Sequence, residues 1–285
     1  MFRLASVFAL IAAAAEAATD AAYDYDHPEL WADMEDSACA GLKNSPIDLY
    51  SMDCTHYANY DLTLGDCGMG DMDFSVTNNG VLLTYKEGSN CTKPSFEIPK
   101  DTIEGTYNHF NTHIHLSSEH TIDGKYFGAE LHMVHLRTDL GRAAVLGTMV
   151  KPSSPVDNPT FERFLKKWQM ARELVDCGCN GDAFEVEGDE GVIDVYENMR
   201  GKDFYHYDGG LTTPPCSEIV WWNFNTEPWV ISVRQFQVMT DIILNTKVDK
   251  DGECKPITVA SKGGSTSRPP QPLNGRSIDK ICALS

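Results

Sequence analysis

The sequence predicts a mainly β protein. Short runs typical of strands recur along the chain, and turns rich in Gly, Asn, Asp and Pro separate them. The 285 residues are 42% hydrophobic and 10% aromatic, which is enough for a substantial core. Length alone allows one large domain or two small ones.

The predicted strands follow one another with a single helical interruption. Residues 158–175 differ because Asn158 can cap a helix, Pro159 suits its first position, and apolar residues then recur at helical spacing. We interpret that apolar stripe as core packing. The predicted strands lie at residues 60–64, 73–77, 81–85, 95–98, 112–116, 129–135, 143–151, 218–225 and 229–233.

The N-terminus has the pattern of a secretory signal peptide over residues 1–17. Arg3 supplies the positive end, residues 4–15 form an apolar run, and Ala15-Glu16-Ala17 is a typical cleavage site. The run is too short to span a bilayer, and no later segment reaches that length. We therefore expect a chain of residues 18–285 that is secreted or otherwise extracytoplasmic and has no transmembrane anchor. Residues 18–36, acidic and aromatic, are expected to form an extended arm.

Nine cysteines fit an oxidising compartment, and the odd number leaves one unpaired or bonded to another chain. Cys177-Gly178-Cys179 could be a metal or redox pair, but two separate disulfides are favoured in an exported chain. Asn90-Cys91-Thr92 fits the glycosylation sequon, if the local fold permits. The net charge of −19 disfavours nucleic acid and anionic lipid as partners. No exposed apolar stripe indicates an oligomeric state.

Three histidines have the spacing of a metal site. His113 and His115 alternate with an apolar residue, so they share one face of a strand, and His132 lies in a second strand-like run. The turn-rich segment 123–125 could pair the two strands as neighbours. Three imidazoles from adjacent strands are the ligand set of a catalytic zinc with an open fourth position. A His-x-His pair alone is more often exposed or structural, so the third histidine is decisive.

Several motifs in order resemble the alpha-class carbonic anhydrases, the exported bacterial and algal members in particular. The match extends from about residue 31 to 278, so residues 261–276, which resemble a linker in composition, would belong to the folded body. The motifs are Asn44-Ser45-Pro46-Ile47-Asp48, Ser118-Glu119-His120-Thr121, residues 129–135 (AELHMVH), residues 211–215 (LTTPP) and residues 268–276 (RPPQPLNGR).

The resemblance implies a fold and an activity. The expected fold is a single mainly β domain (α+β by some schemes) over residues 18–285, built around a large twisted, mostly antiparallel sheet with a few peripheral helices. The implied activity is reversible hydration of CO2 to bicarbonate and a proton, with Zn²⁺ held by His113, His115 and His132. Zinc would lower the pKa of water from ~15.7 to about 7 and so create the attacking hydroxide.

The resemblance also assigns supporting roles to residues around the metal. Glu130 and Asn111 would accept hydrogen bonds from the ligand histidines. Asn111 stands where the family commonly has glutamine. Thr212 would orient the hydroxide while donating its own proton to Glu119, and Thr213 would help to place bicarbonate. A dry wall for CO2 would consist of Val134, Val145, Leu211, Val220 and Trp222, and a disulfide between Cys39 and Cys216 would brace the LTTPP loop.

The shuttle position also departs from the family pattern. Asn78-Asn79-Gly80 matches the segment that precedes the proton-shuttle histidine of fast members, but Val81 follows it here. We therefore expect slower, buffer-dependent turnover, with water chains, buffer or another histidine such as His109 or His56 in the shuttle's place. His27, His120, His135 and His206 are expected to be exposed or structural.

Two other functions compete with a CO2-hydrating zinc lyase. One is a catalytically silent binding or matrix protein, which would usually lack a zinc histidine. The other is a generic zinc hydrolase, which would need a general acid near the metal, and the sequence offers no candidate. The small-molecule pair CO2 and bicarbonate remains the expected substrate.

Overall fold

The computed structural model describes residues 23–97, 105–175 and 191–284. The predicted signal peptide and the Cys177-Gly178-Cys179 pair lie outside them. The helices are a 3-10 helix at Pro28–Asp33, a 3-10 turn at Met69–Asp71, α2 (Pro159–Leu174) and α3 (Val233–Asn245). The strands are β1 (Asp48–Leu49), β2 (His56–Tyr57), β3 (Asp61–Thr63), β4 (Met72–Thr77), β5 (Gly80–Tyr85), β6 (Ser95–Glu97), β7 (Thr106–Leu116), β8 (Thr121–Ile122), β9 (Ala129–Arg137), β10 (Arg142–Ser154), β11 (Phe204–Gly209), β12 (Val220–Asn225), β13 (Trp229–Ser232), β14 (Lys247–Lys250), β15 (Glu253–Pro256) and β16 (Asp279–Cys282).

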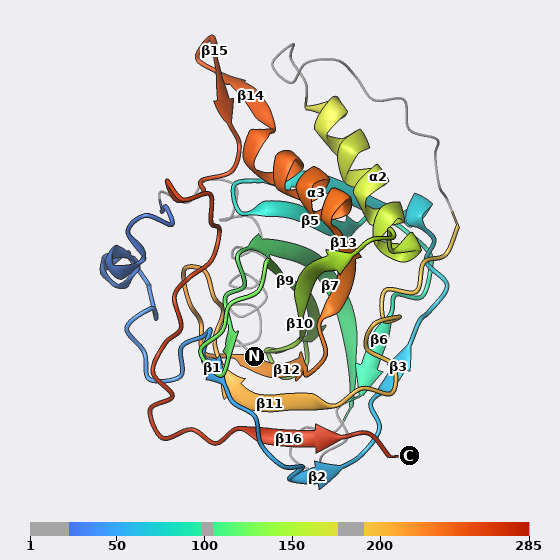
Figure 1. Ribbon diagram of the computed structural model, residues 1–285, viewed down its shortest axis with the longest axis vertical. Helices are drawn as coiled ribbons and strands as arrows, with labels where there is room; N and C mark the ends of the chain where they lie inside the picture. The colour runs from blue at the N-terminus through green and yellow to red at the C-terminus, as the bar shows by residue number, and fades with distance from the viewer. Residues whose placement is uncertain (1–22, 98–104, 176–190, 285) are drawn as a thin grey trace.

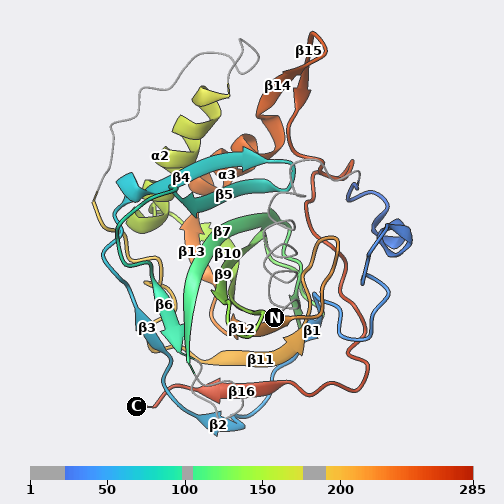
Figure 2. The same cartoon turned by 180° about the vertical axis from the view of Figure 1, so that it is seen from behind.

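One large twisted sheet organises the molecule. In the described residues it has twelve strands, nine of them in the order β2-β16-β11-β12-β10-β9-β7-β5-β4. Most neighbours are antiparallel, whereas β10 pairs in parallel with β12 and β13, and β16 with β2. Figures 1 and 2 show β7, β9 and β10 at the centre, with β16 and β2 at one end. The predicted mainly β fold, with a mostly antiparallel sheet and few helices, is confirmed.

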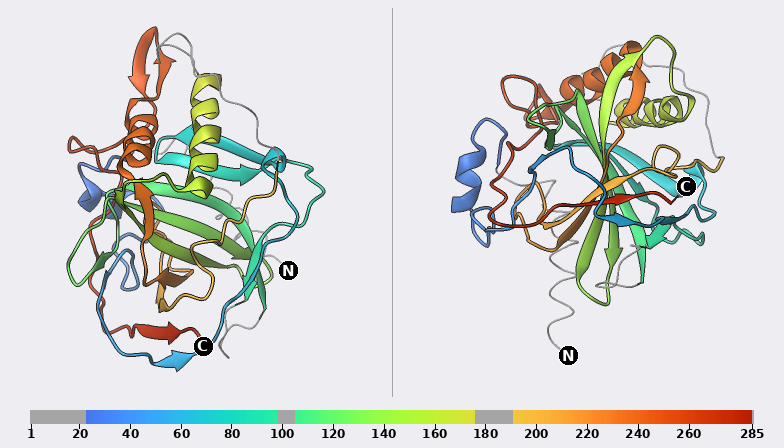
Figure 3. Two further views of the ribbon diagram at one scale, coloured as in Figure 1. Left: turned by 45° about the vertical axis from the view of Figure 1, so that its right-hand side comes forward. Right: turned by 60° about the horizontal axis from the view of Figure 1, so that its bottom comes forward.

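The two helices lie side by side at one end of the sheet. α2 packs against β4 and α3, while α3 also contacts β5, β10 and β13 (Figure 3). The Asn158 side chain accepts a hydrogen bond from the Phe161 backbone and caps α2, as its sequence predicts. None of the helices in the described part of the chain is long and apolar enough to cross a membrane.

The central strands separate two environments. Along β9, Leu131 and Met133 belong to the main hydrophobic cluster, whereas Val134 belongs to a second cluster that also contains Trp222. Since successive side chains of a strand point to opposite faces, His132 and Val134 share the face of the second cluster. The sheet therefore has the main core on one face and a second, partly apolar cluster on the other, which is also the face of His132.

Both ends of the described part of the chain are packed onto this body. The arm predicted to be extended contains a 3-10 helix, and its buried residues Tyr23, Tyr25 and Trp31 pack edge to face beside the Cys39–Cys216 disulfide. At the other end, Arg268 is only 3% exposed, so residues 261–276 are part of the folded body. Cys54–Cys282 and Cys67–Cys91 are also disulfides, and Cys254 is disulfide-bonded as well.

Two histidines lie in the core behind the sheet. His109 bonds the Tyr85 hydroxyl through Nδ1 and the Thr112 hydroxyl through Nε2, each at 2.8 Å. His135 lies 5.1 Å from it, ring centroid to centroid, and its Nε2 is 2.7 Å from the Tyr196 hydroxyl. Burial lowers the pKa of His109 to about 3 and that of His135 well below its ordinary value. Both rings are therefore neutral in the folded protein at mildly acidic pH.

These neutral rings should make the fold sensitive to acid. Between about pH 6.5 and pH 3 the unfolded chain binds protons that the folded chain refuses, so stability falls as pH falls, by up to about 1.4 kcal/mol per pH unit for each histidine. In urea unfolding with excess chelator from pH 4 to 7, His109→Leu should show a shallower loss of unfolding free energy than wild type, even though its stability at neutral pH is lower. The partly exposed His56→Ala is the control. Equal slopes for wild type and His109→Leu would contradict this account.

Candidate metal centre

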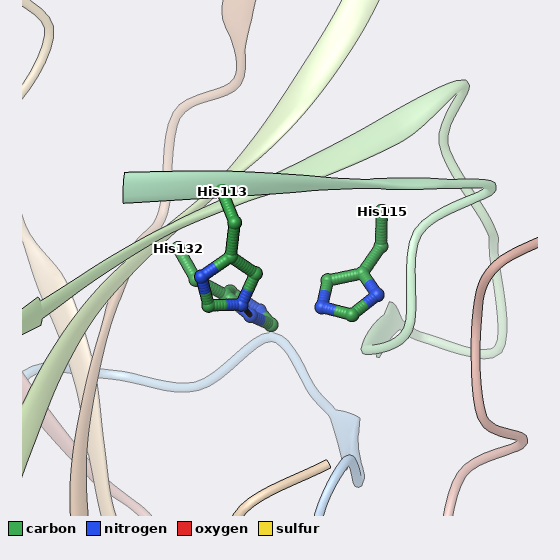
Figure 4. Close-up of side chains that lie close together, drawn as sticks. All are labelled: His113, His115 and His132. Carbon is green, nitrogen blue, oxygen red and sulfur yellow. Dashed lines mark hydrogen bonds between the residues drawn. The ribbon is translucent and has the colours of Figure 1, made fainter. Parts of the chain in front are cut away.

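The pairing of β7 and β9 brings the three histidines together. In the antiparallel register His113 lies directly opposite His132, and His115 lies opposite Glu130. The three imidazole rings have centroids 5.0–5.1 Å apart, and they point into one space beside β7 (Figure 4). One nitrogen from each ring lies within 4.8 Å of the other two, close enough to share one metal ion.

A hydrogen bond fixes the outer nitrogen of each ring. His113 Nδ1 donates to Asn111 Oδ1 at 2.9 Å, and His115 Nδ1 donates to the backbone carbonyl of Thr266 at 2.6 Å. Each of these bonds sets the tautomer. The third ring is fixed in the same way by a carboxylate, since His132 Nε2 donates to Glu130 Oε1 at 2.5 Å. A bare lone pair is therefore left on Nε2 of His113, Nε2 of His115 and Nδ1 of His132.

The inner nitrogens face one another without a proton between them. His132 Nδ1 lies 3.3 Å from His113 Nε2, and the buried Nε2 of His115 has no hydrogen-bond partner in the described residues. Glu119 Oε2, also buried and unpartnered among them, lies 3.4 Å from that same Nε2. Burial, helped by the neighbouring histidines, lowers the pKa of His113. Protonation of this ring is therefore disfavoured as a way to satisfy the facing lone pairs. The donor set therefore fits a divalent cation.

Glu130 connects the histidines to the surrounding backbone. Its Oε1 accepts from His132 and from His120 Nδ1 (2.7 Å), while Oε2 accepts from the backbone N–H groups of Glu119 (2.9 Å) and His120 (2.8 Å). Burial alone would raise the pKa of Glu130, but His120 and His132 lower it below its usual range. The carboxylate is therefore ionised, and its four bonds hold the His132 ring in one orientation.

Glu119 is fixed on one side only. Its Oε1 accepts from the backbone N–H of Arg268 at 3.0 Å, and Arg268 is itself held by Asn44 Oδ1 and the Cys39 carbonyl. Thr212 is buried, but no hydrogen bond joins it to Glu119 in the described structure, since Oε2 has no partner there. Oε2 instead faces the ligand nitrogens.

The loop that carries Thr212 and Thr213 is braced from several sides. Cys216 N–H donates to the Thr213 carbonyl (2.8 Å), and Cys216 is joined to Cys39 by a disulfide with an S–S distance of 2.05 Å. The Leu211 N–H donates to the Ser217 carbonyl across the same loop at 3.1 Å. These contacts fix the loop.

An apolar surface borders the histidines. Trp222 lies 4.8 Å from the His132 ring and donates its indole N–H to the Gly210 carbonyl at 3.1 Å. Val145 pairs with Val134 on one side and with Trp222 on the other, so the three form a row across β9, β10 and β12. Val220 belongs to the same cluster, and the partly buried Leu211 packs against it.

The sequence did not single out several residues that hold this centre. His120, expected to be exposed or structural, is fully buried and accepts from the Tyr207 hydroxyl at 2.6 Å, which in turn bonds Ser45 at 2.9 Å. The position of His120 beside Glu119 was the available signal. Thr266 gave none, because its contribution to His115 is a backbone carbonyl from a segment 151 residues away.

The structure locates the shuttle position, Val81, and the two histidines suggested in its place, His109 and His56. Val81 is 1% exposed and belongs to the main core cluster, paired with Ile114 rather than with a ligand histidine. His109 lies in the same core, where both ring nitrogens are bonded to hydroxyl groups, and this burial disfavours it as a proton carrier. His56 lies on β2, at the end of the sheet order and six strands from β7.

Three converging histidines, two of them buried and one partly buried, on a twisted, mainly β sheet define the class of fold and site. The family model for eukaryotic-type carbonic anhydrase matches residues 26–282, and the chain belongs to that family. It is 30% identical over 273 residues to a carbonic anhydrase of Dunaliella salina, covering 90% of this chain and 44% of that protein. It is also 27% identical to human carbonic anhydrase 12, covering 74% of this chain and 61% of the relative. This chain thus spans about half the length of these relatives.

A solved structure shares both the fold and part of the sequence. The alpha-carbonic anhydrase of Thermovibrio ammonificans, determined with the inhibitor sulfanilamide, superposes with a TM-score of 0.64 at 27% identity. The match covers 88% of this chain and 94% of that one.

The amide at position 111 should control how tightly the centre holds a metal. Asn111→Leu keeps the same branching of heavy atoms but removes the acceptor of the His113 N–H, so zinc affinity measured by chelator competition should fall about 10–100-fold. Asn111→Gln, which keeps an amide oxygen, is the matched control and should retain most of the affinity. Equal weakening by both substitutions would show that the hydrogen bond is not what matters.

Proposed function

We propose that this chain is a zinc-dependent lyase that interconverts CO2 with bicarbonate and a proton. The observation that carries the proposal is the set of three inner nitrogens with bare lone pairs, contributed by His113, His115 and His132, beside an apolar wall. When bound, zinc supplies hydroxide near neutral pH by lowering the pKa of water from ~15.7 to about 7. Three neutral imidazoles leave the charge of the cation undiminished.

The protein's own residues would orient the reactants. The Thr212 hydroxyl would accept a hydrogen bond from the nucleophile and donate its proton to Glu119 Oε2, the oxygen that the described structure leaves without a partner. Arg268 would hold the other oxygen of Glu119, which leaves Oε2 as the acceptor. Thr213, whose carbonyl is held by the Cys216 N–H, would receive bicarbonate.

The apolar row would receive CO2. Val134, Val145 and Trp222 offer no charge or hydrogen-bond donor to the substrate, since the Trp222 N–H is already bonded to Gly210. A dry surface suits a neutral, apolar molecule and allows the charged product to leave. Val220 and Leu211 would complete the wall.

Export of the chain is part of the proposal. Residues 1–17 would direct it into the secretory route, and residues 18–285 would form the working domain outside the cytosol. Its described disulfides, Cys39–Cys216, Cys54–Cys282 and Cys67–Cys91, fit an oxidising compartment.

The reaction requires zinc and its histidine ligands. Purified residues 18–285 should contain one zinc per chain and hydrate CO2 in a stopped-flow pH-indicator assay, with inhibition by a sulfonamide. His115→Ala should lose zinc and lower kcat/KM by more than about 100-fold, beyond the loss typical of a residue around the ligands. His56→Ala is the control and should retain both properties. A zinc-free, inactive wild type with a native fold would favour a silent binding protein.

Proton removal should depend on buffer, because Val81 offers no shuttle and its side chain points into the core. Leu82 lies opposite His113, so by alternation Thr84 lies on the same face about two residues (roughly 7 Å) further along β5. Thr84→His should raise kcat severalfold at low buffer concentration, whereas Val81→His should give no such rise and should lower the melting temperature.

The matching measurement is turnover at rising imidazole concentration. Wild type and Val81→His should accelerate markedly, and Thr84→His should accelerate less. A wild-type kcat that is independent of imidazole would contradict the absence of an internal shuttle.

A further inference from the structure

The loop after β5 carries the chain's single usable glycosylation sequon. Asn90-Cys91-Thr92 is the one Asn-x-Ser/Thr triplet among 285 residues without proline in the middle, since Asn158-Pro159-Thr160 is excluded by its proline. The Asn158 side chain also caps α2. Attachment of an oligosaccharide therefore has one candidate position.

The two reacting side chains of the triplet are accessible. Asn90 and Thr92 are both exposed and lie in a loop. No described residue forms a hydrogen bond with the side chain of either. The amide nitrogen of Asn90 and the hydroxyl of Thr92, the two groups that define the sequon, are thus free to meet an enzyme.

The backbone of the triplet is fixed in the folded chain. Cys91 is joined to Cys67, with Cα atoms 5.0 Å apart. The Thr92 N–H donates to Asp66 Oδ1 at 2.5 Å, and the Thr92 carbonyl accepts from the N–H groups of Asp66 (3.0 Å) and Cys67 (3.4 Å). A transferase that binds the triplet in a cleft needs this backbone free. Glycosylation of Asn90 therefore has to occur before the Cys67–Cys91 disulfide closes.

We propose that Asn90 carries an N-linked oligosaccharide that is attached before Cys67–Cys91 closes. In the transfer, the Asn90 amide nitrogen bonds to C1 of the first sugar of a lipid-pyrophosphate-linked oligosaccharide. The bond from C1 to the pyrophosphate oxygen breaks, the lipid pyrophosphate leaves with the electron pair, and the amide loses a proton to a base. The proposal rests on the proposed export, because the donor lies in the secretory route.

The glycan would lie beside an edge of the sheet and away from the metal centre. The Lys86 N–H and the Ser89 hydroxyl both bond the Asp71 carbonyl, which sets the loop next to the start of β4, the last strand in the order. The metal centre adjoins Leu82, eight residues earlier. A bulky polar group there would hinder pairing of the β4 edge with another chain and leave CO2 hydration unchanged.

The test is translation of the full chain with endoplasmic reticulum microsomes. Wild type should show a form of higher mass that endoglycosidase H removes. Asn90→Gln and Thr92→Ala should lack it, and Thr92→Ser, which keeps the hydroxyl, should retain it. Chains that resist external protease, and so have entered the microsomes, yet lack the heavier form would overturn the proposal. Chains that never enter would overturn export as well as this modification.

A reductant tests whether glycosylation precedes closure of the Cys67–Cys91 disulfide. This test does not require the product to fold. Dithiothreitol should raise the glycosylated fraction of wild type, and Cys67→Ser should raise it without reductant while leaving the sequon intact. An unchanged fraction in both cases would overturn the competition with Cys67–Cys91. Secreted Asn90→Gln should hydrate CO2 at the wild-type rate, which separates this site from the proposed function.

Discussion

The register between β7 and β9 is the constraint on which the centre depends. It sets His113 opposite His132 and His115 opposite Glu130, so the ligands and their main supporting carboxylate face one space. A shift by one residue would turn every one of these side chains to the opposite face, into the core. The apolar residues that alternate with the histidines, Leu131 and Met133 among them, oppose such a shift because they must remain buried.

Buried polar groups convert that register into a rigid centre. The carboxylate of Glu130 accepts bonds from two imidazoles and two backbone amides, so few of its degrees of freedom remain. The hydrogen bonds of the His113 and His115 rings come from different parts of the chain, namely Asn111 on the same strand and Thr266 near the C-terminus. Binding of a cation then requires little reorganisation, which is the physical advantage of such support.

The strands that carry the histidines are predictable from the sequence, because their period-two patterns and flanking turns are strong local signals. Helix α3 was not among the predicted elements, although Ser232 and Gln235 form a capping box at its start. The strand-like run at residues 229–233, which overlaps the first residue of α3, was the stronger local signal. β11 was also absent from the predicted strands, since Phe204–Gly209 is aromatic and buried with little alternation.

The residues around the site also divide into those that local sequence predicts and those that it does not. Ligands and Glu130 follow from strand parity, which is a local property of the chain. The buried bonds of His120 with Tyr207, and of Glu119 with the backbone of Arg268, join segments 87 and 149 residues apart and cannot be read from local pattern. The inward direction of Val81 depends on the pairing of β5 with β7, which only the fold defines.

The most direct test is X-ray absorption at the zinc edge on the purified chain of residues 18–285. The account predicts one zinc with three imidazole nitrogens at about 2.0–2.1 Å and no sulfur ligand, because every described cysteine is disulfide-bonded. The three-nitrogen signal should disappear in His132→Ala. A zinc shell that contains sulfur near about 2.3 Å, or one unaffected by His132→Ala, would contradict the assignment of the metal to this centre.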